Sequence, residues 1–85
     1  MGEPLNIEIR KKIGKNFKKV MLSKGKKLAL RQMDAISGKD HSWIAKFEKG
    51  EVNFTIDSLC KLIEAFKIQP KEIFDFTVDI PKEDK

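Results

Sequence analysis

The chain has 85 residues, which suits a single small domain and excludes a catalytic domain beside a separate binding domain. Lys and Arg total 18 against 13 Asp and Glu, and the formal net charge of +5 favours polyanionic partners such as DNA, RNA or an anionic membrane surface. A hydrophobic content of 40% argues against general disorder, and no apolar run approaches the roughly 20 residues that span a bilayer.

The first segment predicts a basic amphipathic helix. Residues 1–6 are expected to form a short, loosely ordered lead, and from Ile7 apolar residues recur at helical spacing. Gly25 is a natural stop for this helix. The lysines on its other face are interpreted as a solubilising surface rather than a DNA contact. The apolar positions are Ile9, Ile13, Phe17, Val20 and Met21.

Two further helices are predicted on either side of a turn. They cover residues 28–37 and residues 41–49. Gly38 supplies the backbone freedom that a turn position needs, and the carboxylate of Asp40 is suited to accept from N–H groups in the first turn of the following helix. Gly50 ends that helix.

A fourth helix and a short fifth helix follow a loop over residues 51–55. Thr55 or Asp57 is the expected N-cap of the fourth helix. Pro70 breaks this helix and begins the fifth, at a position where its missing N–H costs nothing. The fourth helix has an apolar stripe, on which Cys60 is interpreted as a small buried hydrophobic residue; its members are Ile56, Leu59, Cys60, Ile63 and Phe66.

The C-terminal segment changes to a period of two. Apolar residues alternate with Asp75, Thr77 and Asp79, a pattern typical of a half-buried strand. We hypothesise that this segment pairs as an antiparallel strand with the same segment of a second copy, which would hide an exposed edge. The alternative is that it packs back on its own domain. The predicted dimer contact consists of Phe76, Val78 and Ile80.

The order of these segments resembles the helix-turn-helix family of phage repressors, Cro proteins and restriction–modification controller proteins. The resemblance lies in the Ile-Gly opening of residues 13–17, the turn and recognition helix of residues 37–50, the fourth helix over residues 55–70, and the Ile-Phe ending at residues 73–74. It implies an all-α, five-helix, lambda-repressor-like domain over residues 7–76, with a C-terminal arm over residues 77–85.

The chain departs from the family pattern at several positions. Leu30 stands where the family often has a Gln that contacts a DNA phosphate, and Asp34 stands where a small Ala usually packs between the second and third helices. Lys67 replaces the Gly that usually follows the fourth helix, and Lys26 and Lys27 resemble an insertion before the second.

The resemblance implies that the helix over residues 41–49 enters the DNA major groove. Ser42 and Lys46 lie one turn apart and share a face, and Lys46 is suited to donate to guanine. Ile44 and Phe47 should face inward. Alternatively, His41 is simply exposed, Trp43 belongs to the core, and Lys46 and Lys49 form an ordinary solvated face. The predicted base contacts are His41, Ser42, Trp43 and Lys46, and the predicted phosphate contacts are Lys27, Arg31, Lys39, Lys49 and Asn53.

Nothing in the pattern indicates catalysis, a metal or another cofactor. The chain has one His and one Cys, on different predicted helices, and no Cys/His cluster with the spacing of zinc ligands. The N-terminus lacks the basic and apolar stretches of a secretory signal. We therefore expect a cytoplasmic, nucleoid-associated bacterial or phage protein that is not an enzyme and does not bind membranes.

The leading functional hypothesis is a homodimeric repressor or controller that binds double-stranded DNA at an inverted-repeat operator. Two alternatives remain open. The fold could serve as an antitoxin or adaptor that binds another protein through its C-terminal segment, or the protein could bind nucleic acid without sequence preference.

Overall fold

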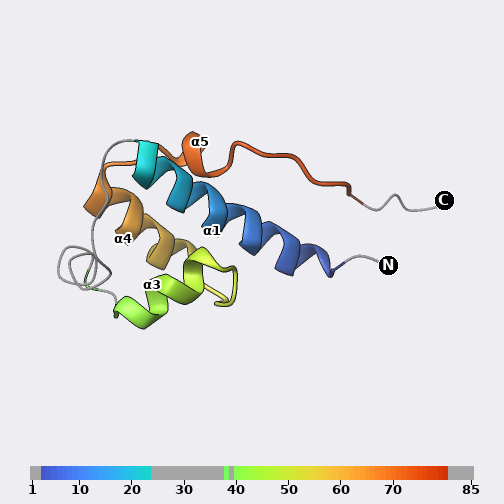
Figure 1. The fold of residues 1–85 in the computed structure, drawn as a ribbon, viewed down its shortest axis with the longest axis horizontal. Coiled ribbons are helices and arrows are strands. Elements are labelled where there is room, and N and C mark those ends of the chain that lie inside the picture. Colours follow the sequence, from blue (N-terminus) through green and yellow to red (C-terminus); the bar gives the residue numbers. More distant parts are fainter. Residues whose placement is uncertain (1–2, 24–37, 39, 81–85) are drawn as a thin grey trace.

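The structure is a computed structural model, and it describes residues 3–23, 38 and 40–80. In that part of the chain it contains four helices: α1 (Leu5–Ser23), α3 (His41–Glu48), α4 (Ile56–Phe66) and α5 (Pro70–Ile73) (Figure 1). The helices and their order confirm the all-α prediction. The predicted helix over residues 28–37 lies outside the described residues, so the count of five stays a prediction.

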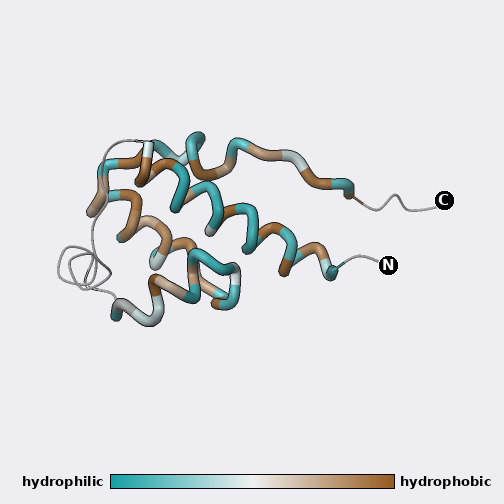
Figure 2. The backbone as a smooth tube through the Cα atoms, viewed as in Figure 1, coloured by the Kyte–Doolittle hydropathy of each residue, from teal (hydrophilic) through white to brown (hydrophobic). Residues whose placement is uncertain are grey.

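α1 begins earlier than its apolar spacing predicts. The carbonyl of Pro4 accepts from the backbone N–H groups of Ile7 and Glu8, each at 3.1 Å. The first helical turn closed by these bonds contains Leu5 and Asn6. Those two residues therefore belong to α1 and not to the lead predicted over residues 1–6. Figure 2 shows hydrophilic and hydrophobic stretches alternating along α1, as an amphipathic helix requires.

The predicted N-caps of α3 and α4 are confirmed. The Asp40 carboxylate accepts from the backbone N–H of Ser42 at 3.2 Å, and the Thr55 hydroxyl accepts from the backbone N–H of Ser58 at 3.1 Å. Each cap satisfies an N–H group that has no partner within its helix. The beginnings of both helices are therefore specified by local sequence.

α4 ends at a residue in the left-handed conformation. Lys67 has φ 56° and ψ 49°, and its backbone N–H and that of Ile68 both donate to the carbonyl of Ile63. A glycine usually occupies such a position because an L side chain crowds its own backbone there. Ile68 is buried directly after it, which holds the turn in place.

Replacing Lys67 with glycine should therefore stabilise the fold. Lys67→Gly removes the left-handed strain at an exposed position, and we expect the free energy of unfolding to rise by about 0.5–1 kcal/mol. Urea denaturation with an unchanged m-value would measure this gain. The matched control is Lys61→Gly inside α4, which should instead lower stability by about 1 kcal/mol. A loss at both positions would contradict the argument.

The core lies where α1, α3 and α4 meet, with Phe17 of α1 at its centre. The Phe17 ring makes edge-to-face contacts with Phe47, at 5.4 Å between centroids, and with Phe66, at 6.0 Å. Such pairs add stability beyond the area that they bury. The buried hydrophobic residues are Ile13, Phe17, Met21, Ile44, Phe47, Leu59, Leu62, Phe66, Ile68 and Ile73.

The predicted apolar stripe of α4 is wrong at two positions. Ile56 and Cys60 are exposed, Ile56 to 67%, whereas Leu62 is fully buried. Successive helical residues are about 100° apart, so the residue that follows buried Leu59 is turned away from the core. Leu59, Leu62 and Phe66 form the buried face. Cys60 is thus an exposed thiol and not a core residue.

The C-terminal segment is not a strand within the described residues. It passes beside α1 as an extended arm that runs towards the N-terminus of that helix (Figure 1). Phe76 packs against the core cluster and Val78 is half-buried, whereas Ile80 is 63% exposed. The alternation of apolar residues thus correctly indicates an extended backbone, and in this single chain the segment packs against its own domain.

Candidate nucleic-acid interface

α3 has one buried face and one exposed face. Ile44 and Phe47 are buried at 0% and 1% exposure, which confirms that they face inward. Ser42, Lys46 and Lys49 are exposed. Their spacing of four and three residues places them along one side of the helix, where a groove of DNA could meet them.

The N-terminus of α3 is organised by Asp40. Besides accepting from the backbone of Ser42, the Asp40 carboxylate also accepts from the Ser42 hydroxyl. Ser42 is thus held by the cap while it remains exposed. His41 is the first residue of α3, and Gly38 has φ 75°, which confirms the turn predicted before the helix.

Trp43 lies between the core and the exposed face. Its indole stacks on the Phe47 ring at 5.5 Å and an interplanar angle of 11°, and the Trp43 side chain is half-buried. Phe54, from the loop before α4, packs on Phe47 in an edge-on arrangement at 5.1 Å. Trp43 therefore supports the packing of α3 while part of its side chain stays exposed.

Two glycines set the position of α3 on α1. A Cβ atom on Gly14 would lie 2.2 Å from the carbonyl oxygen of Phe47 and 2.7 Å from that of Glu48. A Cβ atom on Gly50, where φ is 75°, would lie 2.6 Å from the Cα atom of Lys11. The C-terminal end of α3 thus approaches α1 backbone against backbone, an approach that only glycine permits.

The charge around α3 is mixed. Between residues 40 and 51 there are two lysines, Lys46 and Lys49, and three acids, Asp40, Glu48 and Glu51. A helix with this balance attracts phosphates only weakly by itself, because non-specific affinity depends on an excess of basic residues. Most of the charge that could attract a polyanion therefore lies on other elements.

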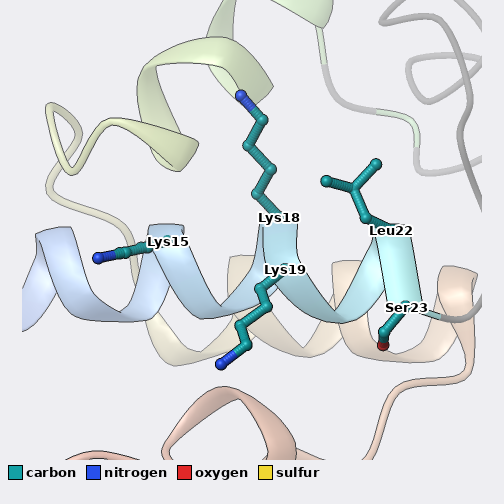
Figure 3. A pocket seen from close by; sticks show the side chains of 5 residues that line it. All are labelled: Lys15, Lys18, Lys19, Leu22 and Ser23. Atoms are coloured by element: carbon teal, nitrogen blue, oxygen red, sulfur yellow. The ribbon is translucent and has the colours of Figure 1, made fainter.

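Lys18 of α1 adds positive charge beside α3. Figure 3 shows its side chain extending from α1 towards α3, whereas Lys19 points the other way, towards α5. Burial raises the pKa of the half-buried Glu48 carboxyl, and the charge of Lys18 lowers it in part. The sequence does not predict this pairing, because helix periodicity does not show which neighbour a lysine approaches.

The raised pKa of Glu48 predicts a pH-dependent cost to stability. Below pH 4.5 the carboxyl is protonated in the folded and unfolded states alike, and no cost arises. As pH rises through the higher pKa of the folded state, the half-buried carboxylate destabilises the fold. Glu48→Gln should therefore stabilise the protein near neutral pH and have little effect below pH 4.5.

Thermal denaturation of both proteins between acid and neutral pH measures this difference. The control is Glu64→Gln, which removes an exposed carboxylate from α4. If Glu48→Gln raised the melting temperature by the same amount at every pH, the cost to stability would not come from the ionisation of Glu48.

The remaining predicted contacts divide into two groups. Lys49 is the C-cap of α3, Asn53 lies in the loop that follows, and both are exposed. The other three, Lys27, Arg31 and Lys39, lie outside the described residues, as do the atypical Leu30 and Asp34.

The described residues form a surface hollow on α1 and no cluster of metal ligands. Among the described residues, the lining of this surface hollow of about 530 Å³ consists of five residues of α1 (Figure 3). The described part of the chain contains no group of three or more His, Cys, Asp or Glu residues placed to hold a metal ion. Within the same ranges, every helix is too short or too polar to cross a membrane.

No family model and no curated protein matches the chain. A solved structure does match: the restriction-modification controller protein C.AhdI from Aeromonas hydrophila, with a TM-score of 0.72 and 27% sequence identity. The match covers 84% of this chain and all of that one. It supports the resemblance to helix-turn-helix controller proteins, because the matched structure is that of a controller protein.

Proposed function

We propose that the protein is a sequence-specific DNA-binding transcriptional regulator, a repressor or controller that binds an inverted-repeat operator as a homodimer. The observation that carries this proposal is α3 itself. Its two large apolar residues anchor it in the core, and its opposite face presents Ser42 and Lys46 one turn apart. The similarity to a restriction-modification controller supports the same function.

In this proposal the residues of α3 read base edges. Lys46 donates to the O6 or N7 atom of a guanine, and Trp43 contacts a thymine methyl group or a sugar. The Ser42 hydroxyl, which donates its hydrogen to Asp40, accepts from a neighbouring base. His41, at the beginning of the helix, is the fourth base contact.

Residues around the helix contact phosphates and supply affinity without sequence information. Lys49 and Asn53 follow α3 and are exposed. The others in the proposed set are Lys27, Arg31 and Lys39.

Dimerisation is part of the proposal because one small domain reads too few base pairs for specific binding in a genome. Two copies related by a two-fold axis would bind half-sites about 10 base pairs apart. We place this regulator in the cytoplasm, associated with the nucleoid.

Selection of bound sequences from a random duplex library, at near-physiological salt, tests the proposal. The wild type is compared with a variant that carries Ser42→Ala and Lys46→Ala, both at exposed positions, and a melting curve verifies that the variant is folded. An enriched inverted repeat that is lost or altered in the variant supports a regulator that reads DNA through α3.

Two outcomes would reject the proposal. Binding that excess competitor DNA abolishes indicates attraction to phosphates without sequence preference. No enrichment by a folded protein favours the protein-partner alternative, in which an antitoxin or adaptor binds through its arm; the exposed apolar side chains of Phe74 and Ile80 would then supply the contact.

A further inference from the structure

The arm over residues 75–80 is attached to α1 through its carbonyl groups. The amide of Asn16 donates to the Asp75 carbonyl at 3.3 Å, and the ammonium of Lys12 donates to the Thr77 carbonyl at 2.9 Å. Both donors are side chains of α1. The Asn16 amide also donates to the Ile73 carbonyl at 3.0 Å, so the arm is held from the point where it leaves α5.

The opposite edge of the arm is open. Successive residues of an extended chain direct their N–H and C=O groups to alternate sides. Because the carbonyls of Asp75 and Thr77 point to α1, those of Phe76 and Val78 point away from it. Within the described residues, no backbone hydrogen bond involves Val78 or Ile80.

An open edge with apolar side chains is a template for another strand. We propose that residues 76–80 pair with the same residues of a second copy as an antiparallel two-stranded ribbon, centred on Val78, while each arm stays on its own α1. This inference rests on the homodimer in the proposed function and specifies its contact surface and register. Val78 then faces Val78 of the second copy, and Phe76 faces Ile80.

Charge selects this register. With Val78 at the two-fold axis, Thr77 faces Asp79, and no carboxylate faces another. A ribbon centred on Thr77 would place Asp75 opposite Asp79 twice, and one centred on Asp79 would place that residue opposite itself. Asp75 and Asp79 are exposed, and like charges directly opposite each other destabilise a strand pair.

A ribbon centred on Phe76 is disfavoured for a different reason. The backbone N–H of Phe76 already donates to the carbonyl of Phe74, at 2.9 Å. In a ribbon centred on Phe76 this occupied N–H lies in the central pair, which must exchange both hydrogen bonds. In the ribbon centred on Val78 it lies in the terminal Phe76–Ile80 pair, which keeps the bond from the Ile80 N–H to the Phe76 carbonyl. Neither backbone group of Val78 has a partner among the described residues, so the Val78 pair can make both hydrogen bonds.

Cysteine cross-linking in the absence of DNA tests the register. Cys60 is exposed and would cross-link by itself, so the background variant is Cys60→Ser. In that background Val78→Cys places two thiols on directly opposed residues, whose Cα atoms are about 5.5 Å apart, within disulfide range. Thr77→Cys is the control, because its two copies lie diagonally at roughly 7–8 Å, beyond that range.

We expect oxidised glutathione to link the Val78→Cys variant into dimers many times faster than the Thr77→Cys variant. Equal rates, or a faster reaction at residue 77, would overturn the register. Melting curves of both variants establish that the half-buried residue 78 tolerates the change.

Introducing a positive or a negative charge at Thr77 provides a second test that leaves the buried side of the arm intact. Thr77→Lys faces Asp79 of the second copy and should strengthen dimerisation, and Thr77→Asp should weaken it. Two-fold symmetry creates the pair twice, so the dimer dissociation constant should differ from wild type by roughly 2- to 30-fold in each direction.

Sedimentation equilibrium without DNA measures these constants. A wild type that stays monomeric, or a dimer unaffected by both substitutions, overturns the ribbon. The library selection tests DNA binding separately. Failure of the arm-to-arm pairing can therefore be told apart from failure of the proposed regulatory function.

Discussion

Replacing Lys46 with alanine should lower affinity for the selected operator by about 30-fold or more. A good contact to a base edge contributes roughly 1–3 kcal/mol, and a homodimer makes it in both half-sites. Lys46 is exposed in the last turn of α3, and alanine is the best helix former, so the fold should not suffer. Titration of a labelled operator, followed by the fluorescence of the single Trp43 or by anisotropy, measures the loss.

The matched control is Lys61→Ala, which removes the same charge from an exposed position of α4. It should change affinity by no more than the loss of one distant charge. Lys49→Ala should weaken binding to all sequences alike. It should also reduce the dependence of affinity on salt concentration by the equivalent of about one phosphate contact for each half-site. If Lys46→Ala and Lys61→Ala lower the affinity for the operator by the same small factor, α3 does not read the operator.

Gly14→Ala should destabilise the domain by about 3 kcal/mol or more. Helix propensity alone predicts a gain of about 1 kcal/mol from this change. The new methyl group, however, would lie 2.2 Å from the carbonyl oxygen of Phe47, and backbone cannot yield as the end of a side chain can. α3 would have to separate from α1, and overpacking on this scale removes much of the stability of a small domain.

The control for this prediction is Gly38→Ala. Gly38 also has a positive φ, but nothing lies within 4 Å of the position of a new Cβ atom. Its replacement should cost only the backbone strain, about 1–2 kcal/mol. Chemical denaturation of both variants gives the comparison, and a Gly14→Ala protein as stable as wild type would mean that the two helices are not in such close contact.

Much of this fold is predictable because its signals are local. Asp40 and Thr55 are suitable caps wherever a helix begins, and Pro70 suits a first turn in any context. The inward placement of Ile44 and Phe47 follows from the period of the helix. These features depend on a few neighbouring residues, which the sequence displays directly.

What the sequence could not predict depends on partners that are distant along the chain. Nothing around Gly14 distinguishes a glycine pressed against another helix from one that is merely tolerated. Cys60 has apolar neighbours at helical spacing, yet α4 buries the face formed by Leu59, Leu62 and Phe66 and leaves Cys60 exposed. The alternation of the arm indicates an extended backbone but not that Asn16 and Lys12 hold it.

The candidate site shows the same division. The exposed positions of Ser42 and Lys46 follow from the period of α3 and from its cap. The proximity of Lys18 to α3, and the burial that raises the pKa of Glu48, arise only from the packing of two helices.

The attachment of the arm through carbonyl groups has an evolutionary consequence. Every amino acid carries a carbonyl, so Asn16 and Lys12 hold the arm largely independently of the residues at positions 77 and 79. The exposed residues of the arm are therefore free to diverge without loss of the folded monomer. If the arms pair as proposed, duplicated copies of such a gene could acquire different charges there and avoid mixed dimers in the same cell, while the part that contacts DNA stays unchanged.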